Sequence, residues 1–348
     1  MHSTNRLLEM KGADNTKTML LIDFSNAFNL VDKSSLIREA RTHCPSISRW
    51  VEFCYSRPAR LYYNDTSLSS SQGVQQGDPL GPLLFGLALH QIAEKIASHC
   101  TLDLHAWYLD DGTIACDTME VSKVLKIIQS DGPSRGLHLN VTKTKIFWPS
   151  FDPRREAAGV FPPNIGMPSV GVELLGGPVS LGLQYCIIMV HSRVGKPLQL
   201  MDKMKQLQDL QSELLLLRNC SGVSRLYFTL RITTPSAIQT DAAHFDKHLF
   251  QYLRQIVVRD GVGFGLIQQR LVTLPLKDGG LGIHTMSNTC QFCFLAPCAQ
   301  TQHLQTTILK QLSVQYRVLG ISKPYRPALK SVGYQTPSSA STTPPLGI

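Results

Sequence analysis

The sequence lacks a hydrophobic run long enough to cross a membrane. Its apolar runs, such as Leu214–Leu217, are far shorter than the roughly 18 to 20 residues that a spanning helix needs. The N-terminal stretch MHSTNRLLEMKGADN also lacks the apolar core of a secretory signal peptide. Both absences argue against membrane insertion and secretion, so we expect an intracellular protein, in the nucleus or the cytoplasm.

The sequence also lacks the regular cysteine pattern of a disulfide framework. The nine cysteines are scattered and odd in number, which argues against a disulfide framework and agrees with a reducing compartment. The stretch CQFCFLAPCAQTQH spaces Cys290, Cys293, Cys298 and His303 with the gap lengths of a zinc knuckle. The ligand order differs from a Cys-Cys-His-Cys knuckle, and the glycines that permit its tight turns are missing. We therefore expect structural cysteines rather than a zinc site.

The sequence has no cluster of Lys or Arg longer than a pair, yet its positive charge is uneven. The net charge is +9, and residues 1–190 carry 17 Lys/Arg against 18 Asp/Glu, whereas residues 191–348 carry 17 against 7. A neutral half beside a basic half suggests that the second half contacts a polyanion such as nucleic acid. Solvated basic residues on helix faces are the simpler alternative.

Hydrophobic periodicity predicts an α+β first half. The apolar content of 43% is ample for a core, and the apolar run Thr18–Phe24 is typical of a buried strand. Helices, hairpins and one further strand are expected to follow: a helix capped by Ser34 or Ser35, a helix at 47–55, a hairpin turning at Asn64-Asp65, a helix from Pro82, a hairpin around residue 110, a helix at 121–128 and a strand at 137–147. This order favours an antiparallel or mixed sheet with helices on one face.

The second half reads differently. From Ser192 to about Arg270 the apolar spacing is helical, and residues 332–348 are rich in Ser, Thr and Pro, which is typical of a disordered tail. The expected regions are an N-terminal remnant at 1–17, an α+β domain at 18–180, a helical region at 181–331 and a tail at 332–348.

The stretch WYLDDGTI places adjacent carboxylates, Asp110 and Asp111, at a predicted hairpin tip. Asp111-Gly112 is a common turn dipeptide, so the simpler interpretation is turn chemistry alone. Asp23 ends the apolar run, and a carboxylate in such a place needs a counter-charge. If neighbouring strands bring Asp23 to the hairpin, the carboxylates could hold the paired divalent ions of a phosphoryl transfer.

Three stretches in order, LLIDFSNAFNLVD, GVQQGDPLGPLLF and YLDD, are followed by GLHLNVTKTK. Together they resemble the palm of reverse transcriptases, particularly those of LINE-type non-LTR retrotransposons and their plant-type relatives. The resemblance covers residues 18–180, with a weaker match at 274–283. It implies a right-hand polymerase palm, a thumb-like helical region and RNA-directed DNA polymerase activity. Two Mg²⁺ ions, an RNA template, a DNA primer and deoxynucleotides would be its cofactors and partners.

The resemblance implies four catalytic residues. Asp23 and Asp110 resemble the two metal-binding aspartates, and Asp111 resembles their less direct companion. Lys143 matches a lysine thought to protonate the leaving pyrophosphate, which is a general-acid role. A solvated strand lysine is the simpler alternative for Lys143.

The resemblance also implies residues that contact substrate. The backbone around Phe24 would help to hold the ions, and Phe28 would screen the sugar 2′ position, although it could equally be a core aromatic residue. Gln76 and Gly77 match residues that line the nucleotide and template pocket, and Tyr108 is expected at the same pocket. The stretch VELLGG at 172–177 resembles a hairpin that grips the primer end.

Several features depart from the family pattern. Asn29 stands where Asp is common, and Leu109 occupies a variable position. Only 22 residues precede Asp23, so we expect the fingers, which lie upstream in the family, to be absent. No endonuclease or ribonuclease H signature is visible. An inactive, truncated remnant that at most binds nucleic acid therefore stands as the alternative function. A structural α+β domain is a more distant third.

Overall fold

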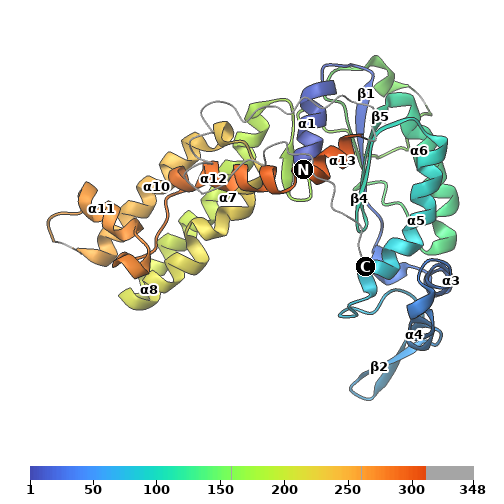
Figure 1. Cartoon of the computed structure of the whole chain (residues 1–348), viewed down its shortest axis with the longest axis horizontal. Helices are drawn as coiled ribbons and strands as arrows, with labels where there is room; N and C mark the ends of the chain where they lie inside the picture. Colours follow the sequence, from blue (N-terminus) through green and yellow to red (C-terminus); the bar gives the residue numbers. More distant parts are fainter. Residues whose placement is uncertain (158, 260, 311–348) are drawn as a thin grey trace, which may run out of the picture. The chain divides into compact units, whose positions relative to one another are not determined.

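The computed structural model describes residues 1–310 except residues 158 and 260. The chain forms two compact units, which can be followed in Figure 1. The first runs from Met1 to Tyr185 and the second from Cys186 to His303, and residues 304–310 group with the first. The expected disordered tail at 332–348 and the end of the expected helical region at 311–331 lie outside the described residues.

A four-stranded antiparallel sheet with the order β4-β5-β1-β6 lies at the centre of the first unit (Figure 1). Its strands are β1 (Lys17–Ile22), β4 (Leu102–Tyr108), β5 (Asp111–Asp117) and β6 (Lys145–Phe147). The strand β1 lies between β5 and β6 and pairs with both. This central position explains why β1 reads as a nearly continuous apolar run.

Helices cover one face of this sheet and complete the main core. Leu20 and Ile114 of the sheet belong to the same buried cluster as Phe85, Ile92 and Leu125 of the helices. The helices of the first unit are α1 (His2–Lys11), α2 (Ala27–Leu30), α3 (Lys33–His43), α4 (Pro45–Tyr55), α5 (Gly81–His99) and α6 (Thr118–Asp131), with short 3-10 turns η1 (Pro133–Arg135) and η2 (Pro153–Glu156). The predicted α+β class is confirmed.

The helix α1 differs from the others because it lies against the opposite face of the sheet. Its Leu7 and Leu8 line a small cavity together with Met19 of β1 and Ala115 of β5. Met19 and Leu20 are neighbours whose side chains point to opposite faces, so both faces of β1 are buried.

The start of α3 differs from the prediction. The cap is Asp32, whose carboxylate accepts a hydrogen bond from the Ser35 backbone nitrogen at 2.7 Å. A carboxylate at this position satisfies a free N–H group and interacts favourably with the helix dipole. The assignment of Ser34 or Ser35 as the cap is therefore wrong by two or three positions, although α3 ends before Pro45 as predicted.

The helix α4 leads into a two-stranded hairpin, β2 (Ala59–Tyr63) and β3 (Thr66–Ser70). Tyr63 pairs with Thr66, so the turn falls at Asn64-Asp65 as predicted, with Asn64 at a φ of 49°. In the part of the chain that the structure describes, β2 and β3 pair only with each other, and nearly all their residues are exposed.

The segment 137–147 is not the single strand that its sequence predicts. It is a strand only over β6, while Leu139 makes an isolated bridge with Phe24. Between these points the chain turns, with the Thr144 backbone nitrogen donating to the Asn140 carbonyl at 2.9 Å. The Asn140 side chain accepts from the Lys143 backbone nitrogen at 3.3 Å, and such local bonds compete with strand pairing. The prediction of one continuous strand is therefore wrong.

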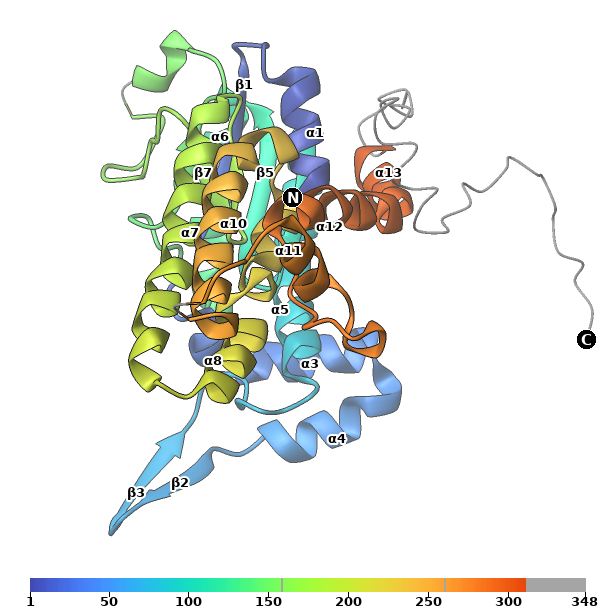
Figure 2. The same ribbon diagram turned by 90° about the vertical axis from the view of Figure 1, so that its left-hand side faces the viewer.

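The second unit is built from helices, and its described residues contain no strand. They are α7 (Leu183–Met204), α8 (Leu210–Leu216), α9 (Tyr227–Ile232), α10 (Pro235–Val257), α11 (Leu266–Thr273) and α12 (Met286–Gln300), with short turns η3 (Lys205–Leu207), η4 (Leu217–Ser221), η5 (Val223–Leu226) and η6 (Leu276–Asp278). A last helix, α13 (Gln302–Lys310), follows. The helices α7 and α10 lie side by side in Figures 1 and 2 and share one core. The predicted helical character of this region is confirmed.

The three cysteines of the stretch CQFCFLAPCAQTQH can be placed on this framework. Cys290, Cys293 and Cys298 all lie in α12, where Cys290 is buried and donates from Sγ to the Ser287 carbonyl. Among the described helices of the chain, none is long and apolar enough to span a membrane.

Candidate active site

Asp23 lies at the end of β1, directly after its last residue, Ile22. In the antiparallel register between β1 and β5, Ile22 pairs with Gly112. Continuing this register by one residue places Asp23 opposite Asp111, the first residue of β5. The sheet therefore brings together two aspartates that are 88 positions apart in the sequence.

The turn that joins β4 to β5 consists of Leu109 and Asp110, because Tyr108 pairs with Asp111. The interpretation of Asp111-Gly112 as the turn dipeptide is therefore wrong, since both residues belong to β5. Leu109 takes the positive φ that the turn needs, at 57°. A leucine in this region is strained by roughly 1 to 2 kcal/mol, because its Cβ approaches the following carbonyl.

Gly112 is required at its position by a neighbouring ring. A Cβ atom on Gly112 would lie 2.4 Å from the Trp107 ring, its partner across the hairpin. The Trp107 ring also stacks on Phe24, with 6.1 Å between the ring centroids. Trp107 thus contacts the residues that follow both Asp23 and Asp111. This role of Trp107 was not predicted from the sequence, although the tryptophan stands in the same WYLDDGTI stretch.

A loop holds the backbone around Asp23 in place. The Asn140 backbone nitrogen donates to the Asp23 carbonyl at 2.9 Å, and the Asp23 backbone nitrogen donates to the Thr144 hydroxyl at 3.3 Å. Thr144 is fully buried, whereas Lys143 beside it is exposed. The same loop therefore fixes Asp23 and presents Lys143.

Asp23, Asp111 and Lys143 line one cavity of about 330 Å³. Lys145 of β6 and Glu173 of the hairpin β7 (Val172–Leu174) and β8 (Gly177–Val179) complete its charged lining. Neither Lys145 nor Glu173 was predicted as a site residue from the sequence. A period-two count from Lys143 along the KTK stretch would have found Lys145, and Glu173 lies in the stretch VELLGG, which was singled out only as a hairpin.

The stretch VELLGG forms the expected hairpin. Leu175 and Gly176 make a two-residue turn with positive φ values of 46° and 77°, the pattern of a type I′ turn. This hairpin carries Glu173, Leu174 and Leu175 to the cavity wall.

The three aspartates of this region lack protein partners. Across the described residues, no donor or cation binds the carboxylates of Asp23, Asp110 or Asp111. Asp111 is exposed as a residue, but partial burial of its carboxyl group, followed by the charges of Asp110 and Asp23, raises its pKa. Crowded carboxylates that form no ion pair are an environment that a bound cation would stabilise.

The aspartates are few for a metal site, but their number suits magnesium. Among the described residues, no group of three or more His, Cys, Asp or Glu side chains is arranged to hold one ion. Magnesium, however, commonly takes one or two protein carboxylates and fills its remaining positions with water and substrate phosphates. Asp23 and Asp111 supply such a pair.

The expected substrate residues lie elsewhere, and none of them lines the cavity among the described residues. Phe24 is buried, and Phe28 is half-buried with its ring 4.4 Å from that of Phe85. Gln76 and Gly77 are exposed in the approach to α5, where Gly77 has a φ of 92°. Tyr108 is exposed beside the hairpin tip.

The approach loop to α5 is held by its own contacts. The Tyr55 hydroxyl donates to the Asp78 carboxylate, and the Gln75 backbone nitrogen donates to the Tyr55 oxygen at 3.3 Å. Gly73 packs so closely on Asn29 that a Cβ atom would lie 2.6 Å from the Asn29 carbonyl oxygen. This close approach, together with a φ of 77°, requires glycine at position 73.

Comparison with known proteins identifies the family. The family described as reverse transcriptase (RNA-dependent DNA polymerase) matches residues 1–179, which is just over half of the chain. The chain therefore belongs to the reverse transcriptase family. No curated protein matches it significantly.

Solved telomerase structures are similar over most of the chain. Apo telomerase from Candida tropicalis is 13% identical with a TM-score of 0.40, and the alignment covers 94% of this chain and 55% of that one. Telomerase from Candida albicans in complex with a fragment of telomeric RNA is 10% identical with a TM-score of 0.34, covering 91% and 52%. The chain thus spans about half the length of these proteins.

Proposed function

We propose that the first unit is the palm of an RNA-directed DNA polymerase derived from a LINE-type retrotransposon. The LINE-type origin rests on the sequence resemblance, and one observation supports the polymerase function: Asp23 and Asp111 face each other across adjacent strands and line one cavity with Lys143. Within a reverse transcriptase family member, such a cavity suits nucleotidyl transfer from a deoxynucleotide to a primer, copied from an RNA template.

Asp23 and the hairpin aspartates Asp110 and Asp111 would hold two magnesium ions. When bound, the ions would activate the primer 3′ hydroxyl and stabilise the charge on the leaving pyrophosphate. The chain's own contribution is to fix the aspartates on adjacent strands, through the pairing of β1 with β5 and the packing of Trp107 on Phe24 and Gly112.

The lysines of the cavity would provide the complementary charge for a triphosphate. Lys143 and Lys145 lie on the β6 side of the same cavity as the aspartates. Lys143 would donate a proton to the leaving pyrophosphate, and Lys145 would neutralise phosphate charge. Glu173, Leu174 and Leu175 form a wall against which the primer end could pack.

The second unit would hold the template–primer duplex as a thumb-like region. Its half of the sequence carries the surplus of positive charge, and three of its acidic residues, Glu213, Asp241 and Asp246, are buried. The exposed surface is therefore more basic than the sequence count suggests, which favours phosphate contacts. The same observation supports the alternative function, a remnant that binds nucleic acid without catalysis.

Primer extension on an RNA template with Mg²⁺ tests the proposal. We expect extension by the full chain and a loss of at least about a hundredfold in Asp23→Asn, because the charge that holds the ions is removed. Asp110→Asn and Asp111→Asn, made separately, would show how much each of the two hairpin residues contributes to metal binding. Asp14→Asn, at an exposed aspartate of the same unit, is the matched control and should keep full activity.

Two results would overturn the polymerase proposal. One is extension that survives in Asp23→Asn. The other is the absence of extension by the full chain together with nucleic-acid binding that weakens as salt rises, which would support the inactive remnant.

A further inference from the structure

Four aromatic side chains of the first unit project into solvent from α4 and β2. Trp50 is 61% exposed, Phe53 77%, Tyr62 75% and Tyr63 72%. Large aromatic residues usually bury most of their surface, so a group of exposed ones marks an interaction site. We call residues 45–70, which comprise α4 and the hairpin β2–β3, the aromatic arm.

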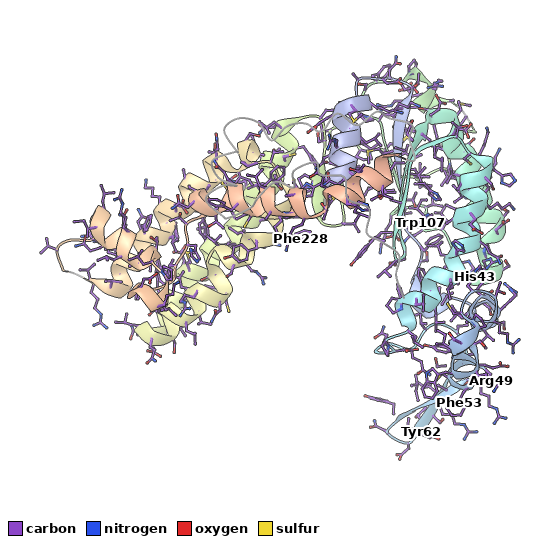
Figure 3. The ribbon with its side chains drawn as sticks, viewed as in Figure 1. His43, Arg49, Phe53, Tyr62, Trp107 and Phe228 are labelled. Carbon is purple, nitrogen blue, oxygen red and sulfur yellow. The ribbon has the colours of Figure 1, made fainter. Side chains whose placement is uncertain are left out.

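The exposed rings form a succession along this arm. On α4, Trp50 and Phe53 stand three positions apart on one helix face, and their rings stack with 5.8 Å between centroids. Figure 3 shows Arg49, Phe53 and Tyr62 following one another from the helix to the hairpin. The rings therefore offer several flat faces along one path.

Positive charge accompanies the rings. Arg49, Arg57 and Arg60 are exposed, and none of the described carboxylates forms an ion pair with them. Of the acidic residues on the aromatic arm, Glu52 is engaged by Arg41, and Asp65 lies at the hairpin turn. Three guanidinium groups are thus available to bind an anionic partner.

The hairpin adds hydroxyl groups to the same surface. Arg60 and Tyr62 are two positions apart on β2, so their side chains share one face of the hairpin. They pair with Ser69 and Ser67 of β3, respectively. An isolated two-stranded hairpin with both faces exposed has little core of its own, so a partner that covers it would stabilise it.

We propose that the aromatic arm binds a single strand of nucleic acid, with bases stacked on Trp50, Phe53 and Tyr62 and phosphates paired with Arg49, Arg57 and Arg60. Alternating flat rings and guanidinium groups match a chain of bases on a phosphate backbone. A single strand is favoured over a duplex because only unpaired bases expose their faces to the rings. The identification of this strand as the incoming template rests on the proposed polymerase function, whereas the binding itself does not.

Fluorescence anisotropy with a labelled, unstructured RNA of about 12 nucleotides tests the proposal on the full chain, without Mg²⁺ or nucleotides. We expect the double variant Trp50→Ala/Phe53→Ala to bind at least about fivefold more weakly, since each stacked base contributes to affinity. Tyr62→Ala should also weaken binding, whereas Tyr62→Phe should retain it because the ring is kept. Arg49→Gln/Arg60→Gln should reduce the salt dependence of binding.

The controls separate local loss from unfolding and from other surfaces. Phe151→Ala removes an aromatic ring that is 66% exposed in the same unit but outside the arm, and it should bind like the wild type. Because all the substituted side chains are exposed, the melting temperature of each variant should stay within about 2 °C of wild type.

Three outcomes would overturn the inference. They are unchanged RNA affinity in Trp50→Ala/Phe53→Ala, an equal loss of affinity for a blunt duplex, and a wild-type dimer seen by light scattering that the double variant abolishes. The last would assign the aromatic arm to contacts between copies of the chain. Asp23→Asn should bind RNA like the wild type. A lack of primer extension would therefore count against the proposed polymerase function and not against RNA binding by the aromatic arm.

Discussion

In the second unit the carboxylate of Asp246 holds the start of a helix, whereas in the first unit the carboxylates of Asp23 and Asp111 face a cavity. Asp246 accepts from the backbone nitrogens of Met286 at 2.6 Å and Ser287 at 3.0 Å, the first residues of α12. The negative charge of Asp246 is balanced by the free N–H groups at the start of α12, where the helix dipole also stabilises a negative charge.

Glu213 in the second unit follows the same rule. It is 5% exposed and accepts from the buried Tyr252 hydroxyl at 2.7 Å. By contrast, Asp23 and Asp111 have no such donors among the described residues, and their charges act on each other. Carboxylates such as Asp246 and Glu213, which accept hydrogen bonds from the protein, stabilise the fold. Asp23 and Asp111 have no such donors in the described part of the chain and face a cavity, which is the arrangement of a ligand site.

The largest expected effect tests this difference through stability. Asp246→Ala should lower the free energy of unfolding by about 3 kcal/mol, because it leaves two N–H groups at the start of α12 without an acceptor. Asp111→Ala should change it by no more than about 0.5 kcal/mol. Urea unfolding, with hydrogen exchange in α12 as the local measure, would compare the two, and equal losses would contradict the distinction.

Gly112→Ala should damage the geometry of the cavity. Its Cβ would lie 2.4 Å from the Trp107 ring, so the ring or the strand must move, at a cost of about 1 to 3 kcal/mol. Primer extension should fall together with the unfolding free energy. Gly86→Ala in α5 is the matched control, because a Cβ there meets nothing within 4 Å and should be neutral or stabilising. Equal behaviour of the two variants would show that Trp107 does not constrain the hairpin.

Leu109→Gly sharpens the comparison at the hairpin tip. Leu109 and Leu83 of α5 are similarly exposed, at 37% and 44%, but only Leu109 has a positive φ. Glycine removes the strain at 109 and adds flexibility inside the helix at 83. Thermal unfolding should therefore show Leu109→Gly to be more stable than Leu83→Gly by about 1 kcal/mol. The reverse order would rule out strain at Leu109.

The smallest expected effect concerns pH. Because the pKa of Asp111 is raised in the folded protein, its ionisation opposes folding, and stability is lost as pH rises from the ordinary aspartate pKa of 3.8 through the raised value. Relative to Asp111→Asn, the wild type should lose melting temperature as pH rises above 3.8. Mg²⁺ should restore it once the Asp111 carboxyl group is ionised. If the melting temperature of the wild type instead rose relative to that of Asp111→Asn as pH increases, the predicted direction would be wrong.

Much of the site was predictable from local patterns. The apolar run of β1 predicted that Asp23 ends a strand, and the hairpins around residues 64 and 110 were expected from their turn residues. These features depend on residues close in the sequence. The predicted positions were wrong by two or three residues where two local signals competed, as at the turn of Leu109-Asp110 and at the cap residue Asp32.

Other features were beyond local reasoning. Whether Asp110 or Asp111 faces Asp23 depends on the register between β1 and β5, and a shift of one residue would exchange them. The stretch around Asn140 reads as a strand until its side-chain hydrogen bonds are seen. Glu173 reaches the cavity only because a distant hairpin packs there.

The sequence by itself determined the family, the helical and strand periodicities and the residue types that chemistry needs, because these depend on neighbouring positions and ordered motifs. The tertiary structure decided which carboxylates face each other, why Gly112 must be glycine beneath Trp107, and which aromatic side chains stay exposed on the aromatic arm. Strand register and packing join residues far apart in the chain, so only the folded protein determines them.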